Sequence, residues 1–189
     1  MNSIKKCQWS LKTTLEEHYH DNEWGVPIKN DSKLFELLSL ELCQSGLSWH
    51  TILKKREGYQ IAFRQFDIEA VANFDESKIE ELLLDSRIVR HRAKISAIIN
   101  NAKCILKIQK EYGSFSNFLW GYVDHKPIVG NWNSEQEVPT STKLSTNISK
   151  DMKKKGFKFL GTTTVYAFMQ SVGIANDHAT SCYRFNQCS

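Results

Sequence analysis

The sequence contains few of the residues that form linkers and turns: three prolines and nine glycines in 189 residues. This scarcity argues against a long linker between domains, and no internal repeat or low-complexity tract is present. The sequence also lacks a run of about 18 to 20 apolar residues, which a membrane-spanning helix needs, and its first residues lack the apolar core of a signal peptide. We therefore expect a single domain over residues 1–189, no membrane association and a cytoplasmic location.

Cysteines are odd in number and widely spaced, at positions 7, 43, 104, 182 and 188. This pattern argues against a disulfide framework and leaves metal ligation or simple burial as their use. Hydrophobic residues make up 41% of the chain and charged residues 24%. That composition is typical of a globular protein with a sizeable core and excludes wholesale disorder.

Neither sign of charge is in large excess. Lys and Arg number 25 and Asp and Glu 21, so the net charge of +4 does not by itself indicate nucleic-acid binding. The distribution is more informative, because residues 143–158 carry six lysines and one acid, and residues 87–94 carry three arginines and one lysine. Each basic run suits either a DNA-facing surface or an ordinary solvated helix face.

Apolar residues recur at helical spacing, and sustained strand alternation is absent. After an N-cap expected at Asp31, leucines follow this spacing over 34–42, and the helix ends near Gly46. A second helix is expected from Ser48, although Gly58 weakens its continuity. Further helices are expected after a cap at Asp75, over 95–106 up to Gly113, after Ser114, and over 144–152 and beyond. The predicted fold class is therefore all-α.

A compact turn separates two helical segments within residues 143–173. Gly156 and Gly161 enclose four residues, a length that suits a helix-hairpin-helix whose backbone approaches a DNA phosphate. The following helix would offer backbone N–H groups and the hydroxyls of Thr162 and Thr163. Positive charge would come from four lysines, Lys153, Lys154, Lys155 and Lys158. The alternative is an ordinary αα-hairpin with a glycine C-cap, and the pattern alone slightly favours it.

Two distant pairs of metal-binding residue types lie near the ends of the chain, Cys7 with His20 and His178 with Cys182. The second pair is spaced four residues apart, so both side chains can reach one ion from a single helical turn. Together the pairs make a Cys2His2 set with no open position, for which we expect structural zinc rather than hydrolytic chemistry. Unrelated cysteines and histidines are the alternative, and His18 competes with His20.

One acidic residue, Glu41, falls on the apolar stripe of the helix expected over 34–42. A buried carboxylate needs partners, and a salt bridge to Arg or Lys at the edge of the core is the plainest interpretation. The functional alternative is a pocket acid that reads a polar or cationic ligand held against aromatic rings. Trp9, Tyr19 and Trp49 are the candidates for those rings.

Eight segments of the chain, taken in order, resemble the DNA-3-methyladenine glycosylase I family, the constitutive bacterial enzymes. They are CQW at 7–9, YHDNEWGVP at 19–27, LELCQSGLSWHTILKKREGY at 40–59, IVRHRAKISAIINNA at 88–102, FLWGYV at 118–123, PTST at 139–142, KKKGFKFLGTTTVYAFMQSVG at 153–173 and NDHATSC at 176–182. The resemblance covers nearly the whole chain. It implies an all-helical member of the helix-hairpin-helix glycosylase superfamily.

The resemblance also implies roles for the pocket candidates. Glu41 matches the acid that recognises the methylated base, Tyr19 and Trp49 match the stacking pair, and Trp9 matches the aromatic residue that closes the pocket. The chain departs from the family at Glu16, where some members have a tyrosine on the pocket side. A second carboxylate there would raise the pKa of Glu41 if both lined the pocket, or it would simply face solvent.

Contacts with DNA and metal follow from the same resemblance. Gly46 and Leu47 match the wedge inserted where the flipped nucleotide leaves the helix, and residues 156–162 match the phosphate-binding hairpin. The four Cys and His residues named above match the ligands of one structural zinc ion. That ion would join the segments 7–20 and 178–182.

The activity implied is base-excision repair: a monomer flips N3-methyladenine out of alkylated double-stranded DNA and removes it by hydrolysis. Thr162, Thr163 and Thr164 follow the hairpin, where strand-cleaving relatives carry a lysine, so we expect a monofunctional glycosylase. The C-terminus has no four-cysteine motif for an iron–sulfur cluster. A catalytically weak helix-hairpin-helix lesion-binding protein is the alternative, against which Glu41 argues, and a small zinc hydrolase would need an open metal position.

Overall fold

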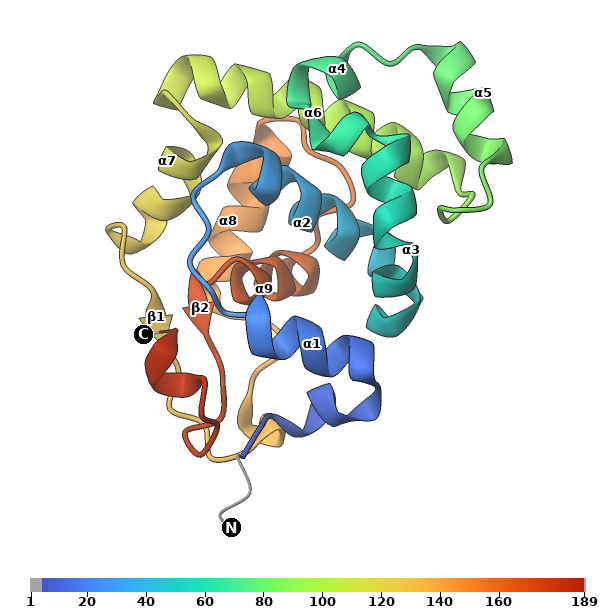
Figure 1. Ribbon diagram of the computed structural model, residues 1–189. Helices are drawn as coiled ribbons and strands as arrows, with labels where there is room; N and C mark the ends of the chain where they lie inside the picture. Colours follow the sequence, from blue (N-terminus) through green and yellow to red (C-terminus); the bar gives the residue numbers. More distant parts are fainter. Residues whose placement is uncertain (1–4, 189) are drawn as a thin grey trace.

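Helices dominate the structure, a computed structural model that describes residues 5–188 (Figure 1). The α-helices are α1 (Thr14–Asn22), α2 (Asp31–Gln44), α3 (Trp49–Ala62), α4 (Ile68–Ala72), α5 (Glu76–Leu84), α6 (Arg92–Tyr112), α7 (Phe115–Trp120), α8 (Lys143–Lys154) and α9 (Thr162–Ser171). Two short strands, β1 (Ile128–Val129) and β2 (Ala175–Asn176), pair in parallel. The predicted helical class is confirmed for the described residues, and none of their helices is long and apolar enough to cross a bilayer.

α2 lies at the centre of the fold, and its leucine side chains are fully buried. The side chain of Asn30 caps the helix, so the cap predicted at Asp31 is wrong. The Asp31 carboxylate instead accepts hydrogen bonds from the backbone N–H groups of Phe115 and Ser116, at 2.9 and 2.8 Å. Asp31 therefore ties the start of α2 to the first turn of α7.

α3 continues unbroken through Gly58, where the sequence indicated a weak point. A Cβ at this position would lie 2.6 Å from both the Cβ and the carbonyl oxygen of Arg87. The glycine thus permits the loop ahead of α6 to pack directly against α3. The predicted start of this helix is confirmed, because the Ser48 hydroxyl accepts a hydrogen bond from the Thr51 N–H at 3.2 Å.

α6 is the longest helix and packs against α2, α4, α5 and α7. Its end at Gly113 agrees with the prediction, since this residue has a φ of 82°, which glycine adopts without strain. Ser114 then caps α7 by accepting a hydrogen bond from the Asn117 N–H at 2.9 Å.

The turn between α8 and α9 ends one helix and begins the next. Gly156 has a φ of 94°, its N–H bonds to the carbonyl of Lys153, and the Phe157 N–H bonds to the carbonyl of Met152. This pair of bonds is the Schellman pattern of helix termination. Gly161 is the N-cap of α9 and supplies no side-chain cap, so the first N–H groups of that helix are left to other acceptors.

The first and last described segments meet at the same end of the molecule (Figure 1). The Tyr183 N–H donates to the carbonyl of Lys5 at 3.0 Å, and the Gly25 N–H donates to the carbonyl of Gln170 at 3.2 Å. Gly173, with a φ of 73°, lies so close to Pro27 that a Cβ would come within 2.5 Å of its nitrogen. These contacts bring residues 7–20 beside residues 178–182.

Candidate functional site

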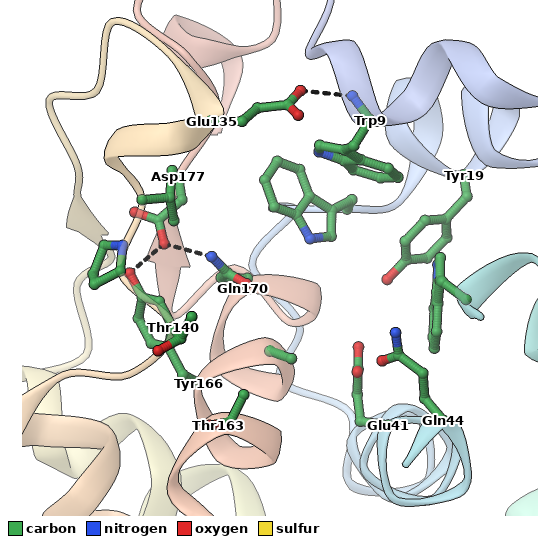
Figure 2. A pocket seen from close by; sticks show the side chains of 15 residues that line it. Trp9, Tyr19, Glu41, Gln44, Glu135, Thr140, Thr163, Tyr166, Gln170 and Asp177 are labelled. Atoms are coloured by element: carbon green, nitrogen blue, oxygen red, sulfur yellow. Dashed lines mark hydrogen bonds between the residues drawn. The ribbon is translucent and has the colours of Figure 1, made fainter. Parts of the chain in front are cut away.

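A cavity of about 370 Å³ opens between α1, the C-terminal half of α2, the start of α3 and α9 (Figure 2). Trp9, Tyr19, Glu41 and Trp49 all line it. Its wall is mainly aromatic with a few polar groups, as is usual for pockets that bind small molecules. The structure therefore gathers the four pocket candidates from three separate helices and the turn ahead of α1.

Glu41 projects from α2 into this cavity and is only 6% exposed. Burial raises the pKa of its carboxyl group to about 8, and a hydrogen bond with Ser171 acts in the opposite direction. No lysine or arginine among the described residues contributes to this pKa, so the salt-bridge interpretation of Glu41 is wrong. A carboxyl group in these surroundings becomes an anion most readily when a cation enters the cavity.

Aromatic rings form one side of the cavity. The rings of Tyr19 and Trp49 lie with centroids 5.3 Å apart and tilted by 56°, and those of Trp9 and Trp24 lie 5.1 Å apart, edge to face. Burial, together with the nearby Glu41, raises the pKa of the Tyr19 phenol well above its ordinary value, so the phenol stays neutral. The buried Trp49 Nε1 has no hydrogen-bond partner among the described residues, which leaves one donor for a ligand.

Asp177 lines the opposite side of the cavity and accepts three hydrogen bonds from other side chains there (Figure 2). Its carboxylate accepts hydrogen bonds from Trp132 Nε1 at 2.7 Å, the Tyr166 hydroxyl at 2.5 Å and Gln170 Nε2 at 2.8 Å. These contacts hold the segment 130–140 against α9. Asp177 therefore shapes the wall, and its acceptor capacity is used by protein donors.

Glu16 lies outside the cavity lining, although it is buried, with 7% of its surface exposed. Thr13 caps α1 by accepting the Glu16 N–H at 3.2 Å, and its hydroxyl donates to the Glu16 carboxylate at 2.9 Å. The Thr13 hydroxyl also lies 3.2 Å from His50 Nδ1. Glu16 thus serves the start of α1, so both predicted alternatives, a second pocket carboxylate and a side chain facing solvent, are wrong. Burial alone accounts for the raised pKa of Glu41.

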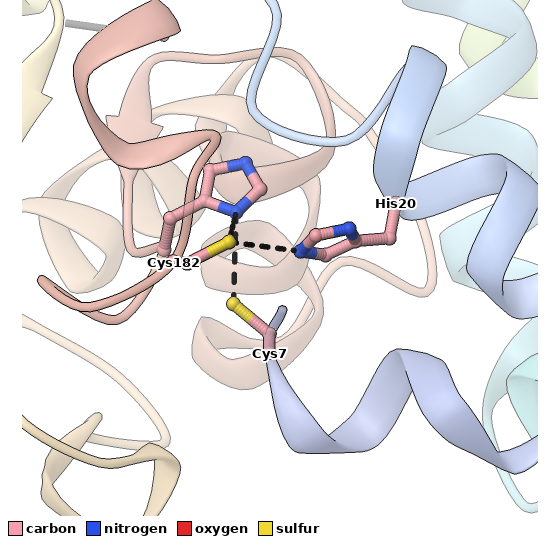
Figure 3. A group of neighbouring side chains, drawn as sticks. Cys7, His20 and Cys182 are labelled. Atoms are coloured by element: carbon pink, nitrogen blue, oxygen red, sulfur yellow. Dashed lines mark hydrogen bonds between the residues drawn. The ribbon is translucent and has the colours of Figure 1, made fainter. Parts of the chain in front are cut away.

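The four Cys and His residues predicted as metal ligands come together in a buried cluster (Figure 3). Their ligand atoms all lie within 4.8 Å of one another. Cys182 Sγ is 3.5 Å from His20 Nε2 and 3.7 Å from His178 Nδ1, and Cys7 Sγ is 3.6 Å from the same His178 nitrogen. The cluster could hold a metal ion, and it joins the two ends of the chain.

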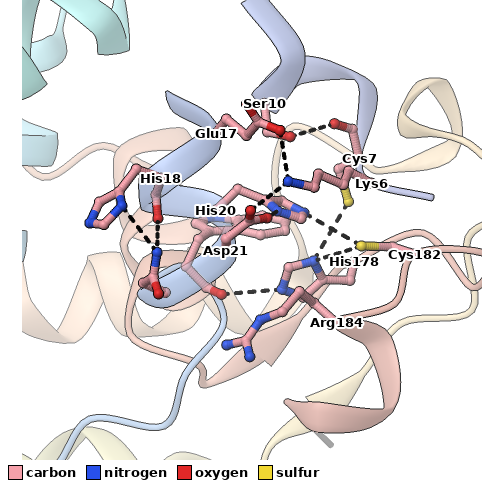
Figure 4. Close-up of polar contacts among 12 residues, drawn as sticks. Lys6, Cys7, Ser10, Glu17, His18, His20, Asp21, His178, Cys182 and Arg184 are labelled. Carbon is pink, nitrogen blue, oxygen red and sulfur yellow. Dashed lines mark hydrogen bonds and ion pairs between the residues drawn. The ribbon is translucent and has the colours of Figure 1, made fainter. Parts of the chain in front are cut away.

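The remaining nitrogen of each histidine has its own acceptor (Figure 4). His20 Nδ1 lies 2.9 Å from an Asp21 carboxylate oxygen, and His178 Nε2 lies 3.1 Å from the carbonyl oxygen of Trp24. Burial opposes ionisation of Asp21, but hydrogen bonds from Lys6 and His20 outweigh it and lower its pKa to about 2. Such outer acceptors fix the ring orientation and tautomer that a histidine ligand needs.

The loop between α2 and α3 lies next to the cavity, between the lining residues Gln44 and Trp49. Gly46 has a φ of 80° and open space around it, and Leu47 is 39% exposed although it is a large apolar residue. The start of α9 borders the cavity as well, because Thr163 lines it. The loop and the start of α9 thus both lie beside the cavity.

The lysines of the α8–α9 region differ in their availability. The Lys154 side chain is 78% exposed and pairs with Asp151 at 3.2 Å, and Lys158 is exposed. Lys155, in contrast, forms an ion pair with Glu111 at 2.8 Å. Lys153 is exposed as well, so positive charge at the hairpin comes mainly from Lys153, Lys154 and Lys158.

A sequence model of the methyladenine glycosylase family matches residues 9–185. The chain belongs to this family. It is 48% identical over 179 residues to DNA-3-methyladenine glycosylase 1 of Escherichia coli (strain K12), covering 95% of this chain and 96% of that protein. It is 46% identical over 177 residues to the DNA-3-methyladenine glycosylase of Haemophilus influenzae, covering 94% and 96% of the two chains. A solved structure of 3-methyladenine DNA glycosylase I from Staphylococcus aureus, which describes recognition of 3-methyladenine, matches with a TM-score of 0.93 and 41% identity over 96% of this chain and 97% of that one.

The family relationship predicted from the eight segments is confirmed, whereas the roles of single residues in this family member stay predictions. Several lining residues were not selected from the sequence. Gln44 follows Glu41 by three positions on the same helical face, and Thr163, Tyr166 and Gln170 share one face of α9. Helical spacing from an already chosen residue would have found Gln44, but nothing local indicates which face of α9 meets a cavity.

Proposed function

We propose that the protein is a base-excision repair glycosylase that removes 3-methyladenine from alkylated double-stranded DNA by hydrolysis of the glycosidic bond. The observation that carries this proposal is the buried carboxyl group of Glu41 in an aromatic cavity of a methyladenine glycosylase family chain. An enzyme that acts on a base in a duplex must first take that base out of the stack. The cavity is of a size for one flipped base.

Charge provides the selectivity in this proposal. Methylation at N3 makes adenine formally cationic, and a desolvated cation against an aromatic face gains about 2 kcal/mol. Tyr19 and Trp49 supply these faces, Trp9 closes the pocket, and Glu41 as a carboxylate accepts hydrogen bonds from the amino edge of the base. Neutral adenine brings no charge to offset ionisation of the buried Glu41, so it binds much more weakly.

The same charge makes the bond easy to break. When the glycosidic bond breaks, the base takes the bonding electron pair and becomes neutral, and the deoxyribose carries the positive charge. Water then adds at C1′ of the sugar and loses a proton. The main task of the protein is therefore to flip, select and hold the base, and Glu41 is its catalytic residue through contact with the reacting base.

The exposed loop beside the cavity serves as the wedge. Gly46 adopts the left-handed backbone conformation that turns the chain, and Leu47 presents an apolar side chain to the gap left by the flipped nucleotide. Insertion of an apolar side chain between base steps partly offsets the cost of unstacking. The position of this loop next to Gln44 and Trp49 supports the role.

The segment 143–173 serves as a helix-hairpin-helix that holds a DNA phosphate. Gly156 and Gly161 allow close approach of the backbone, and the uncapped first turn of α9, with the Thr162 hydroxyl, offers donors to an anion. Lys154 and Lys158 add positive charge that any DNA sequence attracts. Phosphate binding here would anchor the strand while the lesion enters the cavity.

Strand cleavage is not part of the proposed activity. Cleavage by a bifunctional glycosylase requires an amine that attacks the sugar. The described lining of the cavity includes no lysine, and the hairpin leads into Thr162, Thr163 and Thr164 instead. We infer a monofunctional enzyme that leaves an abasic site.

We propose that one structural zinc ion binds in the buried cluster of Cys7, His20, His178 and Cys182. Tetrahedral zinc, with bonds of about 2.3 Å to sulfur and about 2.0 Å to nitrogen, separates its ligand atoms by roughly 3.3 to 3.8 Å. Three of the six distances between ligand atoms, at 3.5, 3.6 and 3.7 Å, fall in that interval, and all four atoms lie within 4.8 Å of one another. With four protein ligands no position is open for substrate, so the ion stabilises the junction of the two chain ends.

Chromatography of bases released from methylated duplex DNA tests the activity. We expect release of 3-methyladenine with little 7-methylguanine, and no strand breaks before abasic sites are cleaved by alkali. Binding of the DNA without release would favour a lesion-binding protein instead.

We propose that the chain acts as one domain and as a monomer, in the bacterial cytoplasm where its DNA substrate lies. Sedimentation with and without DNA tests its oligomeric state.

A further inference from the structure

A buried lysine of α6 holds the loop that carries Leu47. Lys94 is 7% exposed, and its Nζ donates hydrogen bonds to the carbonyl oxygens of Cys43 at 2.9 Å and Ser45 at 2.6 Å. These carbonyl groups belong to the end of α2 and the residue that follows it, where a positive charge is favoured by the helix dipole. Lys94 therefore fixes the last turn of α2 and the start of the loop.

Two asparagines of the same helix hold the α8–α9 hairpin. Asn101 is 1% exposed, its Oδ1 accepts the Lys158 N–H at 2.9 Å, and its Nδ2 donates to the Lys158 carbonyl at 3.1 Å. Asn100 Nδ2 donates to the Gly156 carbonyl at 2.8 Å. Side-chain amides of α6 thus bind the hairpin backbone at the residues before and after Phe157, Gly156 and Lys158.

The two anchoring points lie on one face of one rigid element. Lys94 and Asn101 are seven residues apart, which places them two helical turns and roughly 10 Å apart along α6. Ile95, Ile98 and Ile105 fix this helix in the core, each at most 1% exposed. The loop and the hairpin are therefore both hydrogen-bonded to one helix, and that helix is held in place by the core.

We propose that α6 acts as a spacer that sets the distance between the wedge loop and the phosphate-binding hairpin, with Lys94 and Asn101 as positioning residues. This inference rests on the proposed function. If the two loops could move independently, binding of the phosphate would not force the wedge into the duplex. Because both are fixed to α6, the free energy of backbone binding is transmitted to unstacking of the lesion.

The test compares Lys94→Met, Asn101→Ala and the double variant in single-turnover release of 3-methyladenine from duplex DNA. We expect each single variant to be slowed by about 10- to 100-fold, the range for small misplacement of reacting groups. Binding of the free base, measured by tryptophan fluorescence, should change by less than about twofold, because Lys94 and Asn101 lie outside the cavity lining.

The double variant decides between a spacer and two separate supports. Residues this far apart with no shared partner normally contribute independently, so their fold-losses multiply. A spacer is already ineffective when one end is loose, so the double variant should be within about threefold of the slower single variant. Multiplied losses, or single variants as fast as wild type, would overturn the inference.

Controls separate positioning from general destabilisation and from failure of the proposed function. Lys110→Met removes an exposed lysine of the same helix. Phe63→Leu opens a small cavity in the core away from α6, where Phe63 packs on Tyr59 and Phe66. At temperatures where all variants are folded, both should release base at nearly the wild-type rate, and a loss for Phe63→Leu equal to that for Lys94→Met would contradict positioning. If Lys94→Met does not fold, Lys94→Gln takes its place in the same comparison. Wild-type protein that releases no base rejects the proposed function itself, and this inference with it.

A fluorescence measurement follows the unstacking of the lesion directly. 2-Aminopurine placed beside the lesion becomes more fluorescent when its neighbour is unstacked. We expect wild-type protein to raise this fluorescence and Lys94→Met to bind the same DNA with a smaller rise. An equal rise for both proteins at saturation would also overturn the inference.

Discussion

Replacement of Glu41 by glutamine should stabilise the fold above neutral pH while removing base release. The side chain is 6% exposed, and burial raises the pKa of its carboxyl group to about 8. A folded-state pKa above the unfolded value means that the folded state holds the proton more tightly. The associated stability is fully present below the unfolded pKa and is lost as pH rises through the folded one.

The size of this effect follows from the two pKa values. The pKa rises from 4.5 in the unfolded chain to about 8 in the folded protein, and each pKa unit corresponds to about 1.4 kcal/mol. The wild-type protein should therefore lose about 2 kcal/mol of unfolding free energy by pH 6, and at most about 5 kcal/mol above pH 8. Glu41→Gln has no such loss, because its amide does not ionise.

Urea unfolding of both proteins at pH 5, 6, 7 and 8.5 measures this difference. The free energy of unfolding of Glu41→Gln minus that of wild type should grow by about 4 kcal/mol between the extremes. Any constant cost of placing an amide in the site cancels in this comparison. A difference that stays constant with pH would refute the burial argument for Glu41.

Three other predictions concern the pocket, the hairpin and the metal cluster. Trp49→Ala should weaken binding of free 3-methyladenine by roughly 1 to 3 kcal/mol through lost stacking, measured by calorimetry, with little change in affinity for undamaged DNA; an equal loss for both ligands would remove Trp49 from the pocket. Lys154→Ala should lower affinity for every DNA sequence alike and reduce the slope of log K against log salt by about 1, and an unchanged slope would exclude its contact with a phosphate. Cys182→Ser should lose bound zinc, measured by elemental analysis, and lower the melting temperature; one retained zinc per chain with unchanged melting would contradict the ligand set.

Local signals in the sequence predicted most of the helices but neither α1 nor α4. Ser48 and Ser114 act as caps where they were expected, because a short polar side chain followed by apolar residues at helical spacing is a local pattern. Gly58 and Asp31 departed from expectation for one shared reason. Arg87 packs against Gly58, and the Asp31 carboxylate accepts a hydrogen bond from the first turn of α7. Both partners are distant in the sequence, so no local pattern indicates them.

The sequence also predicted part of the candidate site, namely one wall of the cavity and the cluster of possible metal ligands. Residue chemistry together with family resemblance selected the four aromatic and acidic residues and the four Cys and His residues that the structure brings together. The opposite wall, with Trp132 and Tyr166 bonded to Asp177, was missed because it depends on how the loop 130–140 lies against α9. The hydrogen bonds of Lys94 were likewise invisible, since they join positions about 50 residues apart.

Single-turnover release of 3-methyladenine from methylated duplex DNA, by wild-type protein and by Glu41→Gln side by side, tests the central claim most directly. The released bases are separated by chromatography, and circular dichroism confirms that both proteins are folded. We predict rapid release of 3-methyladenine by the wild-type protein and a rate at least about 100-fold lower for the variant, as for loss of a key charged contact with the reacting group. Equal rates would contradict the role of the buried carboxylate, and wild-type protein that binds the DNA but frees no base would contradict the assignment as a glycosylase.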